Sequence, residues 1–404
     1  MAKFTKSFTQ QEPIPEAAIE RAVEVMRTGR LHRYNAAPGE QTETALLEAE
    51  FAAYMDAPYC LACASGGYAM HVALKAIGLA PGDKVLTNAF TLSPVPGAVD
   101  NAGGVPVLVE TGADYTIDTG HLAETAAASG AKVLLLSHMR GHIGDMDAIM
   151  RICEDHGLTL IEDCAHTMGA HWKGTRSGAF GKVACFSTQT YKHLNSGEGG
   201  LLTTGDAEVM ARAVVHSGSY MLYGRHLAAP DEEVFHRIRL ETPNYSGRMD
   251  NLRASILRVQ LRMLDDNCRR WNELYGRLEM GLRRVPGVTL RDRPQHEHYV
   301  GSSIQFSLPG FSEAAIREFV ARCAADGVEV KWFGDAEPHG FTSRYDSWQY
   351  IRDQEDLPQT RRVLATLCDM RVPLSFDADD CAVIVDVIAD VVDGLAKEGL
   401  DAAE

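Results

Sequence analysis

The sequence predicts an α/β fold: a large domain with a mostly parallel seven-stranded sheet, followed by a smaller α+β domain. Short apolar, β-branched runs bounded by turn residues recur along the first half of the chain, and segments with a helical pattern lie between many of them. Strands that alternate with helices are typical of parallel sheets, because each parallel connection must cross over the sheet. After Pro286 the pattern changes to mixed strands and helices, which indicates the second domain.

The apolar runs define the expected strands of the sheet. Continuous runs such as KVLLLS suit strands that are buried on both faces. The expected strands are Tyr59–Ala64, Lys84–Asn88, Val105–Val109, Lys132–Ser137, Thr159–Asp163, Val183–Thr188 and Leu201–Thr204. The expected helices among them include Thr44–Met55, Tyr68–Ile77 and Asp145–His156.

A long helical segment from Met249 to about Val285 is expected to bridge the two domains, because its apolar residues repeat at helical spacing. Beyond it, Ile304–Leu308 reads as a strand, and Glu313–Asp326 and Asp379–Gly394 read as helices. The expected organisation is an N-terminal segment at 1–28, a large domain that binds the ligand at 29–265, and a bridging helix with the small domain at 266–404.

Charge and composition exclude several classes of protein. The formal net charge of -16 argues against nucleic acid and against an anionic membrane surface as partners. No stretch approaches the roughly 20 apolar residues of a membrane span, and the N-terminal residues lack the apolar core of a secretory signal. The nine cysteines are scattered, which fits reduced thiols in a cytoplasmic protein. Cys60 and Cys63 form a CxxC inside an apolar run, and we interpret them as buried thiols.

The densest chemical pattern lies between Ile161 and Thr204. One expected strand ends on Asp163, a second ends near Ser187, and a turn then presents Lys192 ahead of a glycine-rich stretch. Open α/β sheets bind ligands at the carboxyl edge, where these side chains should meet. Pyridoxal phosphate (PLP) needs this set, because a lysine amine forms the imine and a carboxylate keeps the pyridine nitrogen protonated. The sequence therefore predicts a PLP site.

A phosphate-binding turn is expected upstream. Ser65, Gly66 and Gly67 follow a strand and open a helix, so backbone N–H groups and the helix dipole can face an anion. His138 and His142 could hold a metal if they lay on one helix, but Gly141 lies between them and the run follows a strand. We therefore expect no metal site.

Several motifs make the chain resemble the DegT/DnrJ/EryC1/StrS family of sugar aminotransferases. EDCAHTMGA, G-x-F-G-x-x-x-C-F-S and K-x-L-x-x-G-E-G-G occur here in that order. The resemblance runs from about Gly29 to Leu264 and is looser beyond. It implies the fold-type I architecture of PLP-dependent transferases. It also implies transfer of an amino group from glutamate or glutamine to a keto sugar, nucleotide-linked in many members, or to a keto cyclitol.

Carried over by position, the resemblance implies roles for single residues. Lys192 would hold PLP as a Schiff base and move the proton between substrate and cofactor. Asp163 would pair with the pyridinium nitrogen, and His166 would lie beside the cofactor ring and its phenolic oxygen. The cofactor phosphate would be bound by Ser187 together with the Ser65–Gly67 turn.

The resemblance also implies a homodimer with shared active sites, because Asn244 matches an asparagine that reaches the phosphate from the neighbouring subunit. Two departures from the family pattern concern the substrate. Leu92 stands where relatives stack an aromatic ring on the cofactor, and Phe90 would point the other way in an extended segment. Val330–Trp348 replaces a segment that helps shape the acceptor pocket in relatives.

Two alternatives remain. Sugar dehydratases of the same family replace the Schiff-base lysine with histidine, and Lys192 disfavours that reaction here. A non-catalytic, PLP-binding regulatory protein would need an added DNA-binding or partner module, and the chain offers no basic winged-helix segment.

Overall fold

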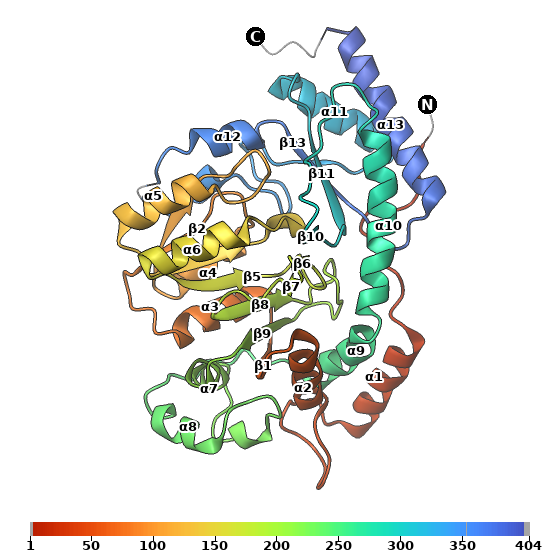
Figure 1. Ribbon diagram of the computed structural model, residues 1–404. Helices are drawn as coiled ribbons and strands as arrows, with labels where there is room; N and C mark the ends of the chain where they lie inside the picture. The colour runs from red at the N-terminus through yellow and green to blue at the C-terminus, as the bar shows by residue number, and fades with distance from the viewer. Residues whose placement is uncertain (1–2, 353, 400–404) are drawn as a thin grey trace.

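A seven-stranded sheet forms the centre of the large domain (Figure 1). The computed structural model describes residues 3–352 and 354–399. Strand order across the sheet is β1-β9-β8-β5-β4-β2-β3, and β9 runs antiparallel to both of its neighbours while the other pairs are parallel. The strands are β1 (Tyr59–Cys63), β2 (Lys84–Asn88), β3 (Val105–Val109), β4 (Val133–Ser137), β5 (Thr159–Asp163), β8 (Val183–Ser187) and β9 (Gly200–Thr204). The predicted α/β class and mostly parallel sheet are confirmed.

Helices cover both faces of this sheet, which explains the continuous apolar runs. In β4, Leu134 and Leu136 belong to one hydrophobic core, and Val133 and Leu135 belong to the core on the opposite face. The first core also takes side chains from α2 (Glu43–Met55), α5 (Thr119–Ser129) and α6 (Met146–His156). The second takes them from α3 (Gly66–Ala76), α4 (Pro94–Asn101), α7 (Ala207–His216) and α8 (Glu232–Ile238).

The predicted continuous helix from Met249 to Val285 is wrong. The chain forms α9 (Asn251–Leu261) and α10 (Leu264–Leu282), with a break at Arg262 and Met263. No Gly or Pro marks the break, and the apolar spacing continues across it. Tertiary packing decides it instead, since α9 packs against α1 (Glu16–Thr28) and α2, whereas α10 packs against α13 (Ala378–Lys397) (Figure 1).

The C-terminal part has the predicted α+β character. A three-stranded antiparallel sheet has the order β11-β13-β12, with α11 and α13 packed nearby. Its elements are β11 (Ser303–Ser307), α11 (Glu313–Ala325), β12 (Lys331–Trp332), α12 (Pro358–Leu364) and β13 (Leu367–Arg371). A further small sheet joins β6 (His171–Trp172), β7 (Thr175–Arg176) and β10 (Glu297–His298). The exact domain limits at 28/29 and 265/266 stay predictions.

The cysteine pair lies inside the sheet, as interpreted. Cys60 and Cys63 are buried free thiols of β1 whose side chains join the cores on opposite faces. Burial raises the pKa of the Cys63 thiol to about 12, and it raises that of Cys60 as well. Among the described residues, every helix is too short or too polar to cross a membrane.

Candidate cofactor and substrate site

Polar side chains gather where the parallel strands of the large sheet end. Ser137 ends β4, Asp163 ends β5 and Ser187 ends β8. In the β4–β5 ladder Ser137 pairs directly with Asp163, so the two side chains reach the same edge. The turn after β8 brings the half-buried side chain of Lys192 to this edge. The carboxyl edge of the sheet is the expected place for a ligand.

The carboxylate of Asp163 is fixed in a network that crosses three strands. Ser137 Oγ donates to one carboxylate oxygen at 2.8 Å, and the Ala165 N–H donates to the other at 3.1 Å. Thr91 Oγ1 donates in turn to Ser137 Oγ at 2.8 Å. The backbone of Ser137 is bound on both sides by the Asn88 side chain. A buried carboxylate held this way stays in one orientation.

The amine of Lys192 contacts the ring of His166. Lys192 Nζ lies 2.7 Å from His166 Nε2. Burial and the positive charge of Arg140 lower the pKa of Lys192 to about 7, although the charge of Asp163 acts in the opposite direction. Burial and the neighbouring Lys192 hold the pKa of His166 well below its ordinary value, so its imidazole is neutral. At neutral pH a substantial fraction of the lysine is therefore the free amine, the form that attacks carbonyls and accepts protons.

The turn at Ser65–Gly67 begins α3. Ser65 Oγ accepts the Tyr68 N–H at 3.1 Å and caps the helix. A Cβ on Gly66 would lie 2.8 Å from Ser187 Cβ, so only glycine fits between the turn and the end of β8. A Cβ on Gly200 would lie 2.2 Å from the Ser65 carbonyl oxygen. The result is a cradle of backbone and hydroxyl groups at a helix N-terminus, the surroundings that a phosphate prefers.

These residues fit PLP. The predicted edge of the sheet carries the amine of Lys192 and the oriented carboxylate of Asp163. The backbone cradle at Gly66, which has no room for a Cβ, lies at the same edge. Asn88, Thr91 and Ser137 also belong to the site and were not predicted. Their only signal was a polar residue at or just after the end of an apolar strand.

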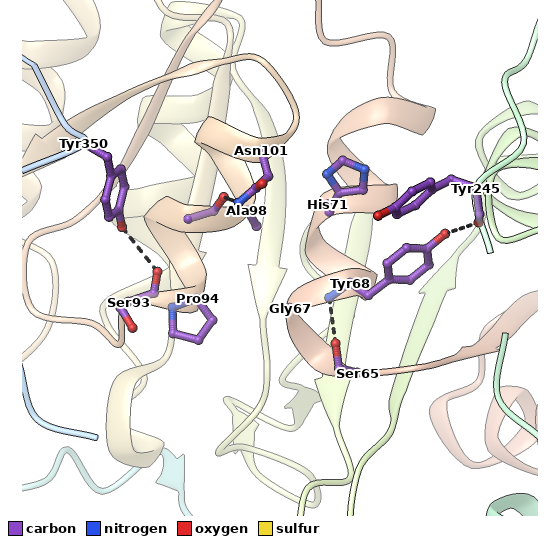
Figure 2. Close-up of a pocket in the computed structure, with 11 residues that line it drawn as sticks. Ser65, Gly67, Tyr68, His71, Ser93, Pro94, Ala98, Asn101, Tyr245 and Tyr350 are labelled. Atoms are coloured by element: carbon purple, nitrogen blue, oxygen red, sulfur yellow. Dashed lines mark hydrogen bonds between the residues drawn. The ribbon is translucent and has the colours of Figure 1, made fainter. Parts of the chain in front are cut away.

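A cavity of about 780 Å³ opens beside the Ser65–Gly67 turn, between α3 and α4. Figure 2 shows Ser65, Gly67 and Tyr68 on one side of it and Ser93 and Pro94 on the other. Tyr68 Oη donates to the Tyr245 carbonyl oxygen at 2.6 Å, which ties the loop before α9 to the start of α3.

Asn244 adjoins that tyrosine on an exposed loop of the single chain. The remaining predicted site residues, Ser65–Gly67, Asp163, His166, Ser187 and Lys192, are brought together by the sheet edge. The ring of Phe90 packs on Phe333 with centroids 4.9 Å apart. Leu92 packs against the same cluster.

His138 and His142 have separate partners. His138 Nε2 lies 3.1 Å from the Glu162 carboxylate, whereas His142 Nε2 lies 2.8 Å from Gln305 Oε1. Glu162, His138 and Cys164 do lie close together and are buried. The Glu162 oxygens are already filled by His138 and by the backbone N–H groups of Gly178, Phe180 and Gly181. We interpret this cluster as structural.

The sheet topology and the residues at its edge place the chain among the PLP-dependent enzymes of fold type I. Within that class it belongs to the DegT/DnrJ/EryC1/StrS aminotransferase family, which matches residues 14–389. Members of this family use PLP.

Several named relatives match more than half of the chain. The chain is 36% identical over 250 residues, 61% of its length, to the erythromycin biosynthesis sensory transduction protein EryC1 of Saccharopolyspora erythraea, and it spans 64% of that protein, just under two thirds. It is 31% identical over 286 residues to 3-amino-5-hydroxybenzoate synthase of Amycolatopsis mediterranei, covering 70% of this chain and 71% of the relative. It is 29% identical over 328 residues to L-glutamine:2-deoxy-scyllo-inosose aminotransferase of Micromonospora echinospora, covering 79% and 73%.

Solved structures agree over the whole fold. The crystal structure of a 3-amino-5-hydroxybenzoic acid synthase superposes with a TM-score of 0.82 at 26% identity, covering 98% of this chain and 100% of that one. The crystal structure of S. venezuelae DesV in complex with a ketimine intermediate gives a TM-score of 0.77 at 25% identity, covering 92% of this chain and 93% of that one.

Proposed function

We propose that this chain is a PLP-dependent aminotransferase that moves an amino group from glutamate or glutamine to a keto sugar or a keto cyclitol. The family supports the reaction, and similarity to the L-glutamine:2-deoxy-scyllo-inosose aminotransferase of M. echinospora supports both a glutamine donor and a cyclitol ketone acceptor. One observation carries the proposal: the buried Lys192 amine, with its pKa lowered to about 7, lies 2.7 Å from a neutral His166.

The residues have distinct parts in this proposal. Lys192, Asp163 and His166 would hold the PLP ring, and the Ser65–Gly67 turn with Ser187 would hold its phosphate. When bound, PLP supplies an electron sink for the carbon that loses its proton. Lys192 takes that proton and returns it, because its amine is partly unprotonated at neutral pH. Asp163, oriented by the hydrogen bond from Ser137, would place its carboxylate toward the ring nitrogen.

His166 has a positioning part. Its neutral imidazole contacts the lysine amine and leaves it little freedom to turn away from the substrate carbon. The close approach of the Gly66 backbone to Ser187 would help to hold the phosphate, and with it the ring, in a fixed place relative to that amine.

The active form in this proposal is a cytoplasmic homodimer with shared sites. Asn244 would reach the phosphate of the other subunit. Support comes from exposed apolar side chains on the segments around it, which a partner would cover: Tyr220 at 59%, Met221 at 56%, Leu240 at 86% and Tyr245 at 66% exposure. The nine buried free thiols fit a reducing compartment.

Spectroscopy tests the reaction. Protein loaded with PLP should show a visible absorption band that L-glutamine or L-glutamate bleaches as the pyridoxamine form appears. Keto sugars and keto cyclitols are then screened for the one that restores the band. Lys192→Ala serves as the matched control and should bind PLP without this response. A loaded wild-type protein whose band no amino acid changes would contradict the proposal.

A regulatory role is the second candidate, because two relatives carry such names: EryC1 and a pleiotropic regulatory protein of Geobacillus stearothermophilus, 35% identical over 231 residues. A binder that performs no chemistry has no need of a lysine amine with a lowered pKa. The same titration separates the two, since a non-catalytic binder would keep its visible band in the presence of every amino acid.

A further inference from the structure

A chain of buried polar contacts runs from the small domain to the guanidinium of Arg140. Arg140 follows β4 in a short 3₁₀ turn (Met139–Gly141) and lines one cavity with His166 and Lys192. Its Nη2 lies 2.9 Å from Oδ2 of Asp369, a fully buried residue of β13 in the small sheet. Both side chains are shielded from water, so each depends on the other for a partner of opposite charge.

Gln305 holds the other oxygen of that carboxylate. It lies on β11 directly opposite Asp369 in the β11–β13 ladder, and both residues are buried. Gln305 Nε2 donates to Asp369 Oδ1 at 2.7 Å and to Ser303 Oγ at 2.8 Å. Its Oε1 lies 2.8 Å from Nε2 of the buried His142, and Arg291 Nη1 lies 2.9 Å from His142 Nδ1. The contacts therefore form one continuous chain from Arg291 to Asp369.

The hydrogen bonds of this chain run in one direction. A guanidinium only donates, so His142 Nδ1 accepts from Arg291, and His142 Nε2 carries the proton that Gln305 Oε1 accepts. Burial and the charges of Arg293 and Arg291 hold the pKa of His142 well below its ordinary value, which keeps the imidazole neutral, as this arrangement requires. Gln305 is then left with its N–H groups facing Asp369, and the carboxylate is held in one orientation.

Few contacts hold the guanidinium of Arg140 in place. Its Nε and Nη2 are buried and donate no hydrogen bond within the described residues, where Asp369 supplies the one carboxylate within 4.0 Å. A second contact is the ring of Phe333, whose centroid lies 5.7 Å from the guanidinium carbon. The backbone φ of Arg140 is 54°, in the left-handed region that residues other than glycine adopt rarely and only where their surroundings enforce it. The ion pair with Asp369 therefore determines where this charge lies.

The charge of Arg140 acts on the amine of Lys192. Burial, followed by the charge of Arg140, lowers the pKa of Lys192 to about 7. The other charged or titratable groups around this amine are Asp163 from β5, Asp369 and Arg371 from β13, and the imidazoles of His166 and His193. Both imidazoles are neutral, because burial and the charge of Lys192 lower their pKa values. A movement of Arg140 away from this place would leave less of the amine in its free form at neutral pH.

We propose that this chain of buried groups holds the Arg140 guanidinium beside Lys192 and thereby keeps the amine of that lysine ready to accept a proton. Asp369, Gln305 and His142 are its positioning residues, and they act on the amine through Arg140. The small domain thus controls a reactive group of the large one. The use of this amine in amino transfer rests on the proposed function, whereas the placement of Arg140 does not.

Chemical labelling of the PLP-free protein tests this placement. Acetic anhydride modifies the free amine, so labelling of Lys192 across a pH series, followed by mass spectrometry of its peptide, gives the midpoint of its titration. The wild-type midpoint should lie near pH 7. Arg140→Gln should raise the midpoint by about one pH unit, because a positive neighbour is removed. Gln305→Leu should raise it by about half a pH unit, because Asp369 loses its support and the guanidinium of Arg140 moves away.

Gln260→Leu is the matched control. Gln260 is also buried and hydrogen-bonded, since its Nε2 donates to the Asn195 carbonyl oxygen at 2.7 Å and its Oε1 accepts the Asn195 N–H at 2.9 Å, but it lies outside the chain. Its replacement should lower the melting temperature as that of Gln305 does and leave the midpoint of Lys192 unchanged. Gln305→Asn, whose shorter amide cannot reach both of its neighbours, replaces Gln305→Leu if that variant does not fold, and should also raise the midpoint.

A double variant shows whether Gln305 acts through Arg140. The protein with both Arg140→Gln and Gln305→Leu should have the midpoint of Arg140→Gln alone, because the group that Gln305 positions is gone. The inference is overturned if a folded Gln305 variant keeps the wild-type midpoint, or if its shift adds in full to that of Arg140→Gln. A protein whose Lys192 responds as expected but which transfers no amino group would contradict the proposed function and leave the positioning chain standing.

Discussion

At the scale of single residues, the groups that surround the amine of Lys192 determine its pKa. Its hydrogen-bond partner is a neutral imidazole, and positive Arg140 lies in the same pocket. Protonation of the amine is therefore opposed by burial and by charge, with only Asp163 and Asp369 favouring it. The folded protein pays for this reactive form in stability.

Replacing Lys192 by Met should stabilise the PLP-free protein in a pH-dependent way. The folded-state pKa of about 7 lies below the ordinary 10.5 of an unfolded chain, so the unfolded chain binds more protons between these values. The wild type therefore gains stability as the pH rises from 7 to 10.5. The advantage of Lys192→Met should be on the order of 5 kcal/mol below pH 7 and vanish near pH 10.5. Urea unfolding across this range measures it.

Lys182→Met is the control, since that lysine is exposed. Equal stability differences for the two variants at every pH would show that burial does not perturb Lys192.

Adding one methyl group at Gly66 should loosen the cofactor. The new Cβ would meet Ser187 Cβ at 2.8 Å, and the turn and the end of β8 must separate. Gly67→Ala is the matched control, because its Cβ would find no atom nearer than 3.7 Å. We expect Gly66→Ala to weaken PLP binding by about tenfold, within the range of about 1–3 kcal/mol for overpacking, with Gly67→Ala near wild type. Fluorescence titration with PLP measures both, and equal affinities would refute the steric account.

The sequence could predict the site residues that end a strand or come immediately after one. Asp163, Ser187 and the Ser65–Gly67 turn were found because an apolar run ends at each of them. The hydrogen bonds that orient Asp163 could not be predicted. Ser137 and Thr91 form them because β4 lies between β5 and β2 in the sheet, and the sequence does not reveal which strands are neighbours.

At the scale of elements, the sequence near a helix N-terminus determines where the helix begins, through capping side chains. It does not determine the break between α9 and α10. Side chains of Thr42, Ser65, Asp118, Asp145 and Asp206 cap five helices of the large domain. The break at Arg262 and Met263 depends on what each half packs against, which is information that no local pattern holds.

The last helix offers a test of its N-terminus. Asp377 and Asp380 form a capping box at the start of α13, and Lys6 pairs with both. Asp377→Ala should lower the free energy of unfolding by about 1 kcal/mol and leave amino transfer unchanged. Asp390→Ala, an exposed position within the same helix, controls for the lost charge. Thermal unfolding decides, and an equal loss in both variants would exclude the cap as the cause.

At the scale of the whole molecule, the site lies between parts of the chain that fold as different layers. Lys192 and Asp163 come from the large sheet, Arg371 comes from the small one, and Gln11 of the N-terminal segment lines the same cavity. The exposed loop with Asn244 and its apolar neighbours faces outward in the single chain.

Mixed dimers test whether sites are shared. Lys192→Ala and Asn244→Ala chains should each be inactive or nearly so alone. After unfolding and refolding together in equal amounts, about a quarter of the sites should regain both residues, because a hybrid dimer places both defects in one site. Mixing without exchange of subunits is the control. Activity that stays at the level of the single variants after exchange would contradict shared sites.

The antiparallel strand β9 also constrains the order of events during synthesis. Among the strands that the structure describes, β9 is the one that pairs with β1, and the two are separated by more than a hundred residues of chain. A growing chain on the ribosome has therefore made β2, β3, β4, β5 and β8 before the Ser65–Gly67 turn acquires its place against Gly200 and Ser187. We expect nascent chains that end before residue 204 not to bind PLP. PLP binding should appear late in synthesis and abruptly.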